Sequence, residues 1–114
     1  YEMMYNLEKL EEFGIFMSVL RAVGGGSKSS YWLQMKADIL GKTIVPLDLD
    51  EAGIAGTAML SGVCCGGYPS LEEAEKLFVK KKQPYEPNPE RHQVYLKQYQ
   101  KFKTIRQLIA DVFK

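Results

Sequence analysis

Three consecutive glycines, Gly24 to Gly26, stand between two apolar segments of different periodicity. The run before them, residues 15–23, is short and rich in β-branched and aliphatic side chains, which is typical of a strand. After Ser29 and Ser30 the apolar spacing becomes helical. Glycines let the backbone adopt positive φ and approach a ligand closely, and the free N–H groups of the following helix carry partial positive charge. The pattern predicts a corner that binds a phosphate or a nucleotide, with a tight turn that binds nothing as the alternative.

A dinucleotide-binding βαβ module is a second interpretation of the same corner. Its glycine fingerprint matches Gly24 and Gly26, and Asp48 ends the next expected strand about twenty residues on, where a ribose-binding carboxylate would lie. Against this interpretation, Ser29 replaces the third glycine, and the glycine-rich stretch at 51–66 has no part in that motif. The dinucleotide module is therefore the weaker of the two interpretations.

The length and composition are those of one ordinary globular domain, with 114 residues, 46% hydrophobic and 25% charged. Fifteen basic and fourteen acidic residues leave a net charge of +1, so no general field favours nucleic acid or anionic lipid. The run Lys80-Lys81-Lys82 is interpreted as the solvated end of a helix. No apolar run reaches the roughly 18 residues of a membrane span, and no leader pattern opens the chain. We expect a cytoplasmic protein that binds neither nucleic acid nor membrane.

The two cysteines, Cys64 and Cys65, are adjacent in the sequence. Neighbouring residues cannot form an ordinary loop-closing disulfide, and a metal site would require further Cys or His at ligand spacing. The single histidine, His92, is distant from them, so we expect no protein metal site. The two thiols are expected to be small buried groups at the end of a helix.

Hydrophobic periodicity and capping residues predict a mainly helical chain with two short strands. The expected helices cover residues 1–12, 29–40, 51–66, 71–78 and 89–113, the expected strands cover 15–23 and 43–47, and an extended loop covers 83–90. A strand, a helix and a strand at this spacing form a βαβ unit with parallel strands. Glycines cost a free-standing helix about 1 kcal/mol each, so we expect the glycine-rich helix at 51–66 to lie inside, against the sheet.

Two parallel strands rarely make a stable sheet by themselves, because both outer edges keep unpaired N–H and C=O groups. In addition, the first helix has neither a cap residue nor a turn before its periodic pattern, which starts at Tyr1. We therefore expect the chain to be the C-terminal part of a larger α/β domain, whose other strands are absent or come from a partner.

Three stretches of the chain, taken in order, resemble one known family. The stretches are Gly24-Gly25-Gly26-Ser27-Lys28-Ser29 with the residues 31–41 that follow, Glu51-Ala52-Gly53-Ile54-Ala55-Gly56-Thr57-Ala58-Met59-Leu60, and Tyr85-Glu86-Pro87-Asn88-Pro89-Glu90. The first is similar to the adenosine motif of the FGGY carbohydrate kinases, closest to the xylulokinase-like branch. The second is similar to the small-residue helix after the next strand in that family, and the third is similar to the family's tail. The resemblance covers nearly the whole chain.

The resemblance implies a partial actin-like, ribonuclease-H-like α/β fold. Members of the family have two such domains, and ATP and sugar meet in the cleft between them. Residues 1–114 would then be the C-terminal part of the ATP-binding domain, without the N-terminal sugar-binding domain. The implied activity is ATP-dependent phosphoryl transfer to a sugar hydroxyl, with Mg on the phosphates and with a pentulose such as xylulose as the substrate.

By the same resemblance, Gly24, Gly25 and Gly26 approach the α-phosphate and the adenosine of ATP. Ser29 falls where some relatives carry Asn near the adenine, whereas Lys28 is interpreted as an exposed turn residue rather than a phosphate ligand. The catalytic aspartate and the sugar-binding residues lie upstream in the family. No catalytic residue is therefore assigned in this chain, and we expect the chain alone to be inactive.

The remaining polar and aromatic candidates have structural interpretations. Surface, turn or terminal positions are expected for Asp38, Asp48, Asp50 and Asp111, and packing or helix-surface positions for Trp32 and Gln34. A non-enzymatic alternative is a helical interaction module that docks through Tyr95, Tyr99 and Phe102, although an aromatic face at helical spacing more usually packs on its own domain. If part of the domain is absent, the uncovered surface is expected to support self-association or docking to the rest of the kinase.

Overall fold

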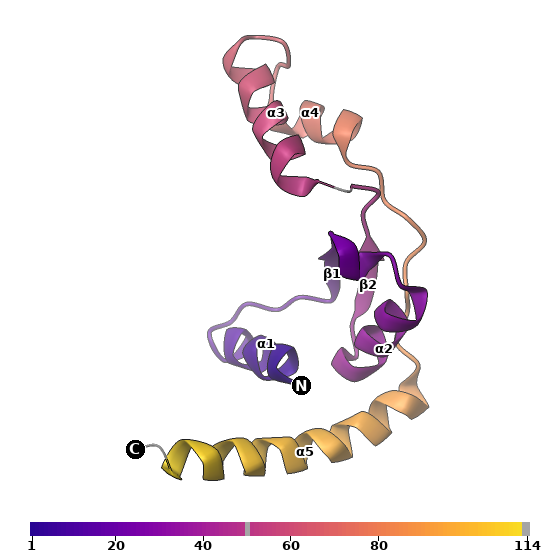
Figure 1. The fold of residues 1–114 in the computed structure, drawn as a ribbon, viewed down its shortest axis with the longest axis vertical. Helices are drawn as coiled ribbons and strands as arrows, with labels where there is room; N and C mark the ends of the chain where they lie inside the picture. Colours follow the sequence, from indigo (N-terminus) through magenta and orange to yellow (C-terminus); the bar gives the residue numbers. More distant parts are fainter. Residues whose placement is uncertain (50, 113–114) are drawn as a thin grey trace.

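The computed structural model describes residues 1–49 and 51–112. Our interpretation of Asp50 and the place of Phe113 in the last helix therefore lie outside the described residues. In this part of the chain the elements follow in the order α1 (Glu2–Glu12), β1 (Val19–Ala22), η1 (Gly25–Ser27), α2 (Ser30–Leu40), β2 (Thr43–Pro46), α3 (Ala52–Cys64), α4 (Leu71–Phe78) and α5 (Pro89–Val112). The predicted βαβ unit is confirmed as β1, α2 and β2 (Figure 1).

Strands β1 and β2 form a parallel pair in which Val19 lies opposite Thr43 and Ala22 lies opposite Pro46. Each strand has four residues, so β1 is shorter than the predicted run. β1 pairs only from Val19 onward, because its partner β2 cannot begin until α2 has ended. Gly41 ends α2 in the left-handed conformation, with φ of +62°. The sheet is thus a short platform that carries the glycine corner at one end of β1.

The outer edge of β2 is paired by the segment 80–85, which runs antiparallel to it. Ile44 and Tyr85 exchange both backbone hydrogen bonds, at 3.0 and 2.8 Å, and the N–H of Lys82 donates to the carbonyl oxygen of Pro46 at 2.8 Å. We expected both outer edges of the sheet to be unpaired, and for this edge the expectation is wrong. Tyr85 anchors the proline-containing loop to the sheet, and the segment satisfies backbone groups that would otherwise be exposed.

The three lysines at residues 80–82 belong to this paired segment. Helix α4 ends at Phe78, so our interpretation of the lysines as the end of a helix is wrong. Their side chains are exposed, and Lys82 Nζ forms an ion pair with the Asp48 carboxylate at 2.8 Å. The extended backbone prevails here because it completes the hydrogen bonds on the edge of β2.

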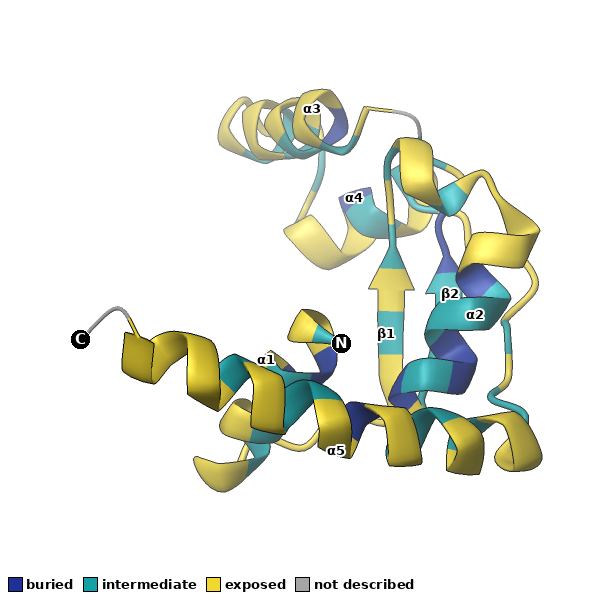
Figure 2. Cartoon of the chain, turned by 60° about the horizontal axis from the view of Figure 1, so that its bottom comes forward, coloured by how far each residue is buried: buried dark blue, intermediate teal, exposed yellow. Residues whose placement is uncertain are grey.

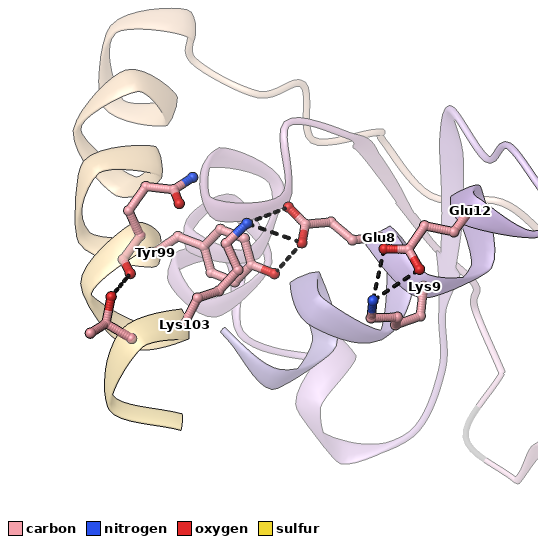
Figure 3. Close-up of polar contacts among 7 residues, drawn as sticks. Glu8, Lys9, Glu12, Tyr99 and Lys103 are labelled. Atoms are coloured by element: carbon pink, nitrogen blue, oxygen red, sulfur yellow. Dashed lines mark hydrogen bonds and ion pairs between the residues drawn. The ribbon is translucent and has the colours of Figure 1, made fainter. Parts of the chain in front are cut away.

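The hydrophobic core lies where α1, α2, β2 and α5 meet (Figure 2). Its buried members are Met4, Leu7, Leu33, Ala37, Leu40, Ile44 and Tyr99. Tyr99 is fully buried, and its Oη donates to Glu8 Oε2 at 2.7 Å, while Lys103 Nζ lies 3.4 Å from the same oxygen (Figure 3). Burial and the hydrogen bond to the Glu8 carboxylate raise the pKa of Tyr99, so the protonated phenol links α5 to α1.

Two aromatic residues of α5, Tyr99 and Phe102, pack within the chain. Tyr99 stacks on Phe102 with ring centroids 6.0 Å apart, and Tyr1 from the start of the chain lies 5.9 Å from the Tyr99 ring. These residues therefore form core, as their helical spacing predicts, and they do not form a docking surface. The side chains farther along α5 are exposed, namely Ile105, Leu108, Ile109 and Val112.

Asp38 is buried, with 3% of its surface exposed, although we interpreted it as a surface residue. Its Oδ1 accepts hydrogen bonds from the Gln34 side chain at 2.9 Å and from the Asn88 N–H at 2.8 Å. Its Oδ2 forms an ion pair with Arg91 Nε at 2.8 Å, and its backbone oxygen lies 2.9 Å from His92 Nδ1. This single carboxylate joins α2 to the loop and the first turn of α5.

Helix α3 lies away from the sheet, so our expectation that it would lie inside is wrong (Figure 1). It packs on α4 and on the turn between them, where a Cβ on Gly62 would lie 2.3 Å from the ring of Tyr68. Among the described residues of α3, Ala55 alone is buried. Cys64 and Cys65 are exposed, which corrects our expectation of buried thiols, because the helix that carries them does not join the core.

The chain is elongated, with extents of 54 × 35 × 26 Å and a radius of gyration of 17.9 Å. A compact domain of about 100 residues has a radius of gyration of about 13 Å. The difference arises because α3 and α4 project from one end and the exposed half of α5 from the other (Figure 2). Within residues 1–49 and 51–112, no helix is both long and apolar enough to cross a bilayer.

We expect Asp38→Ala to lower the free energy of unfolding by about 2–3 kcal/mol, because it leaves the Asn88 N–H and Arg91 without their acceptor. Asp48→Ala is the matched control, since it removes an exposed ion pair and should cost no more than about 1 kcal/mol. Urea unfolding followed by circular dichroism measures both changes. Equal midpoints for the two variants would show that Asp38 does not hold α2 to α5.

Candidate functional site

The glycine corner lies at the carboxyl ends of the two parallel strands. Strand β1 ends at Ala22, the backbone turns at Gly24, and the short helix η1 leads into α2. Pro46 of β2 lies opposite Ala22, so both strands end at the same edge of the sheet. Ligands of open α/β sheets bind outside this edge. The structure thus places the predicted site where the topology of the sheet favours ligand binding.

Gly24 is the residue that turns the chain. Its φ of +80° and ψ of −170° belong to a region that side-chain-bearing residues essentially do not occupy. The Ser27 N–H and hydroxyl both donate to the Gly24 carbonyl oxygen, at 3.0 and 2.7 Å, and hold the turn closed. The fold alone therefore explains why residue 24 is glycine.

Gly25 and Gly26 are different, because the fold does not require glycine at either position. Neither has a positive φ. A Cβ on Gly25 would meet nothing within 4 Å, and a Cβ on Gly26 would meet only the Trp32 ring at 3.9 Å, which is ordinary contact. The backbone of both residues is exposed. Because neither residue carries a side chain, a ligand can approach this backbone closely.

Ser29 is the N-cap of α2. Its Oγ accepts a hydrogen bond from the Trp32 N–H at 3.3 Å, and the side chain is exposed. Because α2 begins at Ser30, the partial positive charge of its N-terminus lies directly after the glycines. The four predicted site residues, Gly24, Gly25, Gly26 and Ser29, therefore lie at one corner. Their role in binding a ligand stays a prediction.

A hollow of about 270 Å³ adjoins the corner. Apolar side chains of α1 and the two strands line most of it, and Gly26, Ser27 and Lys36 line the side that faces α2. Lys36 was not among the predicted site residues. Its signal in the sequence is its position one turn after Trp32 on the helix that follows the glycines.

The acidic residues near the corner are engaged elsewhere. The Asp48 carboxylate, which the dinucleotide interpretation would use for a ribose, is paired with Lys82 at 2.8 Å. The Asp38 carboxylate is buried in its contacts with Asn88 and Arg91. In the described part of the chain, no group of three or more His, Cys, Asp or Glu side chains could hold a metal ion. We therefore assign neither a base nor a metal ligand to the corner among the described residues.

Known proteins are similar to this chain over most of its length. Residues 1–65 match the model of the C-terminal domain of the FGGY family of carbohydrate kinases. The chain is 31% identical to xylulose kinase of Staphylococcus epidermidis over 98% of its length, and 35% identical to autoinducer-2 kinase of Salmonella paratyphi A over 90%. It spans only 23% and 19% of those two proteins.

A solved structure shows the same arrangement of elements. The ligand-bound xylulose kinase of Lactobacillus acidophilus matches 94% of this chain with a TM-score of 0.78 and 25% sequence identity, and the match covers 22% of that protein. The family model covers more than half of the chain, and the similarity to the relatives extends over nearly all of it. The chain therefore belongs to the FGGY family of carbohydrate kinases.

Proposed function

We propose that the chain is the C-terminal part of the ATP-binding domain of a sugar kinase and that it binds ATP at Gly24 to Gly26. The observation that carries this proposal is the exposed backbone of Gly25 and Gly26, where the fold itself does not need glycine. Phosphate groups suit this position because the N-terminus of α2 follows directly and contributes partial positive charge. Ser29 lies at the same turn, beside the nucleotide.

The chemistry of transfer needs more than this corner. Phosphoryl transfer requires a divalent metal on the phosphates and a residue that orients the attacking hydroxyl. The described residues hold no group of acidic or histidine side chains suited to a metal, so Mg is expected to be carried in with the phosphates of ATP. No residue of the chain is proposed as catalytic. The chain alone should be inactive, and sugar-dependent ADP production by the purified chain would contradict this.

The proposed substrate is a pentulose such as xylulose. The support is similarity, since one relative is a xylulose kinase and a solved structure with the same fold is another. A further relative acts on a different compound, as its name, autoinducer-2 kinase, indicates. The sugar contacts are proposed to lie in the N-terminal sugar-binding domain. The exposed apolar side chains of α3 and α5 are proposed to dock on the rest of that kinase.

We expect Gly25→Asp to weaken Mg-ATP binding about tenfold or more, because it places a negative charge where the phosphates approach. Gly25→Asn is the matched control, with the same shape and no charge, and should lose less affinity. Calorimetric titration of each variant with Mg-ATP measures the change. Wild-type affinity in Gly25→Asp would contradict phosphate binding at the corner.

Unfolding experiments on the same variants separate binding from folding. The Gly25 variants should unfold within about 0.5 kcal/mol of the wild type, because a side chain there meets nothing. Gly24→Ala should instead lower the free energy of unfolding by about 1–3 kcal/mol, because alanine cannot adopt the φ and ψ of that position without strain. Equal stability of Gly24→Ala and Gly25→Ala would contradict the distinct roles of the two glycines.

A further inference from the structure

Trp32 is the single tryptophan of the chain, and the core does not use it. It is the third residue of α2, and 46% of its surface is exposed. The buried face of α2 consists instead of Leu33, Ala37, Asp38 and Leu40. Of the two positions that we expected, packing or helix surface, Trp32 has the second, and it leaves a half-exposed indole beside the glycine corner.

The indole of Trp32 borders the glycine corner directly. A Cβ built on Gly26 would lie 3.9 Å from both Cδ1 and Nε1 of the ring, so the five-membered edge of the indole lies against the backbone of Gly26. The Trp32 N–H is held by Ser29 Oγ, which fixes the start of the helix that carries the ring. The ring is thus positioned by the same turn that presents the exposed glycines.

Lys36 supports the ring from one turn further along α2. Its Nζ lies over the indole, 5.3 Å from the ring centroid, which is within the range of a cation–π contact. Lys36 also lines the hollow of about 270 Å³ together with Gly26 and Ser27. The indole therefore has a cation over it, the exposed backbone of Gly26 at its edge, and nearly half of its surface exposed.

We infer that Trp32 is a positioning residue for the nucleotide, on which the base stacks while the phosphates lie at Gly25 and Gly26. This inference rests on the proposed function. A flat aromatic surface beside a phosphate site suits a nucleobase, because every base presents a π-face and stacking tolerates the identity of its polar edge groups. The larger ring system of a purine overlaps the indole more than a pyrimidine does. Trp32 therefore favours ATP and GTP over CTP and UTP.

The test uses inorganic tripolyphosphate as a ligand that has the phosphates of ATP but no base. Tripolyphosphate and Mg-ATP should both shift the amide resonances of Gly25 and Gly26. Of the two ligands, only Mg-ATP should quench the fluorescence of Trp32, which is the single tryptophan of the sequence. Trp32→Leu should weaken ATP binding about tenfold and should remove the preference for purine nucleotides, while tripolyphosphate affinity stays unchanged. Trp32→Phe should restore part of the preference.

Tyr31→Leu is the matched control, because Tyr31 is the adjacent aromatic residue, is 75% exposed, and should not contribute to base selectivity. If Mg-ATP shifts the glycine amides but Trp32→Leu keeps the wild-type selectivity and affinity, the inference is wrong and the proposed function stands. If neither ligand shifts the glycine amides, the proposed function is wrong and the inference is overturned with it. An equal loss of ATP and tripolyphosphate affinity in Trp32→Leu would show a structural role and would also overturn the inference.

Discussion

The buried carboxylate of Asp38 is the contact on which the arrangement of the chain depends. It accepts hydrogen bonds from the Gln34 side chain within α2 and from the Asn88 N–H, and it forms an ion pair with Arg91. The contacts with Asn88 and Arg91 connect α2 to the residues that begin α5. The segment 80–85 pairs with the edge of β2, and α5 packs on α2 and reaches α1 through the hydrogen bond from Tyr99 to Glu8. An unsatisfied buried carboxylate is costly, so the chain reaches this arrangement only when all the partners are in place.

Helix α2 is consequently held at both ends, and this matters for the site. Its C-terminal end is fixed by Asp38 and by Gly41, where a Cβ would lie 2.6 Å from the His92 ring. Its N-terminal end is capped by Ser29 and carries the backbone that follows the three glycines. A rigid helix presents the corner in one geometry, which is what a preorganised phosphate site requires.

The features that could be predicted from the sequence are those with local causes. The glycine turn lies where it was expected, and it follows, like the cap at Ser29 and the left-handed Gly41, from the conformational preferences of one or two residues. The corner was likewise recognisable from its spacing, and its likeness to the FGGY adenosine motif agrees with the family that the comparisons show.

The features that could not be predicted depend on contacts between distant segments. Asp38 was expected on the surface because its partners lie some fifty residues away along the chain, at positions such as Asn88. The edge pairing of residues 80–85 has the same origin. For α3, small residues were taken to mean burial, yet its glycines at positions 53 and 56 face open space. Small residues indicate that another segment can approach the helix closely, but they do not identify that segment. For Trp32 the sequence left packing and surface positions open, because helical spacing alone does not separate a core aromatic from an exposed one.

The central claim is that the exposed glycine corner binds the phosphates of ATP, and an amide-resolved NMR titration tests it most directly. The chain would be titrated with Mg-ATP and, separately, with NAD, while the amide resonances from Gly24 to Ser30 are followed. The account predicts that Mg-ATP shifts these resonances more strongly than NAD at the same concentration and leaves the distant end of α5 unchanged. Shifts with NAD alone, or an unchanged corner with both nucleotides, would contradict it.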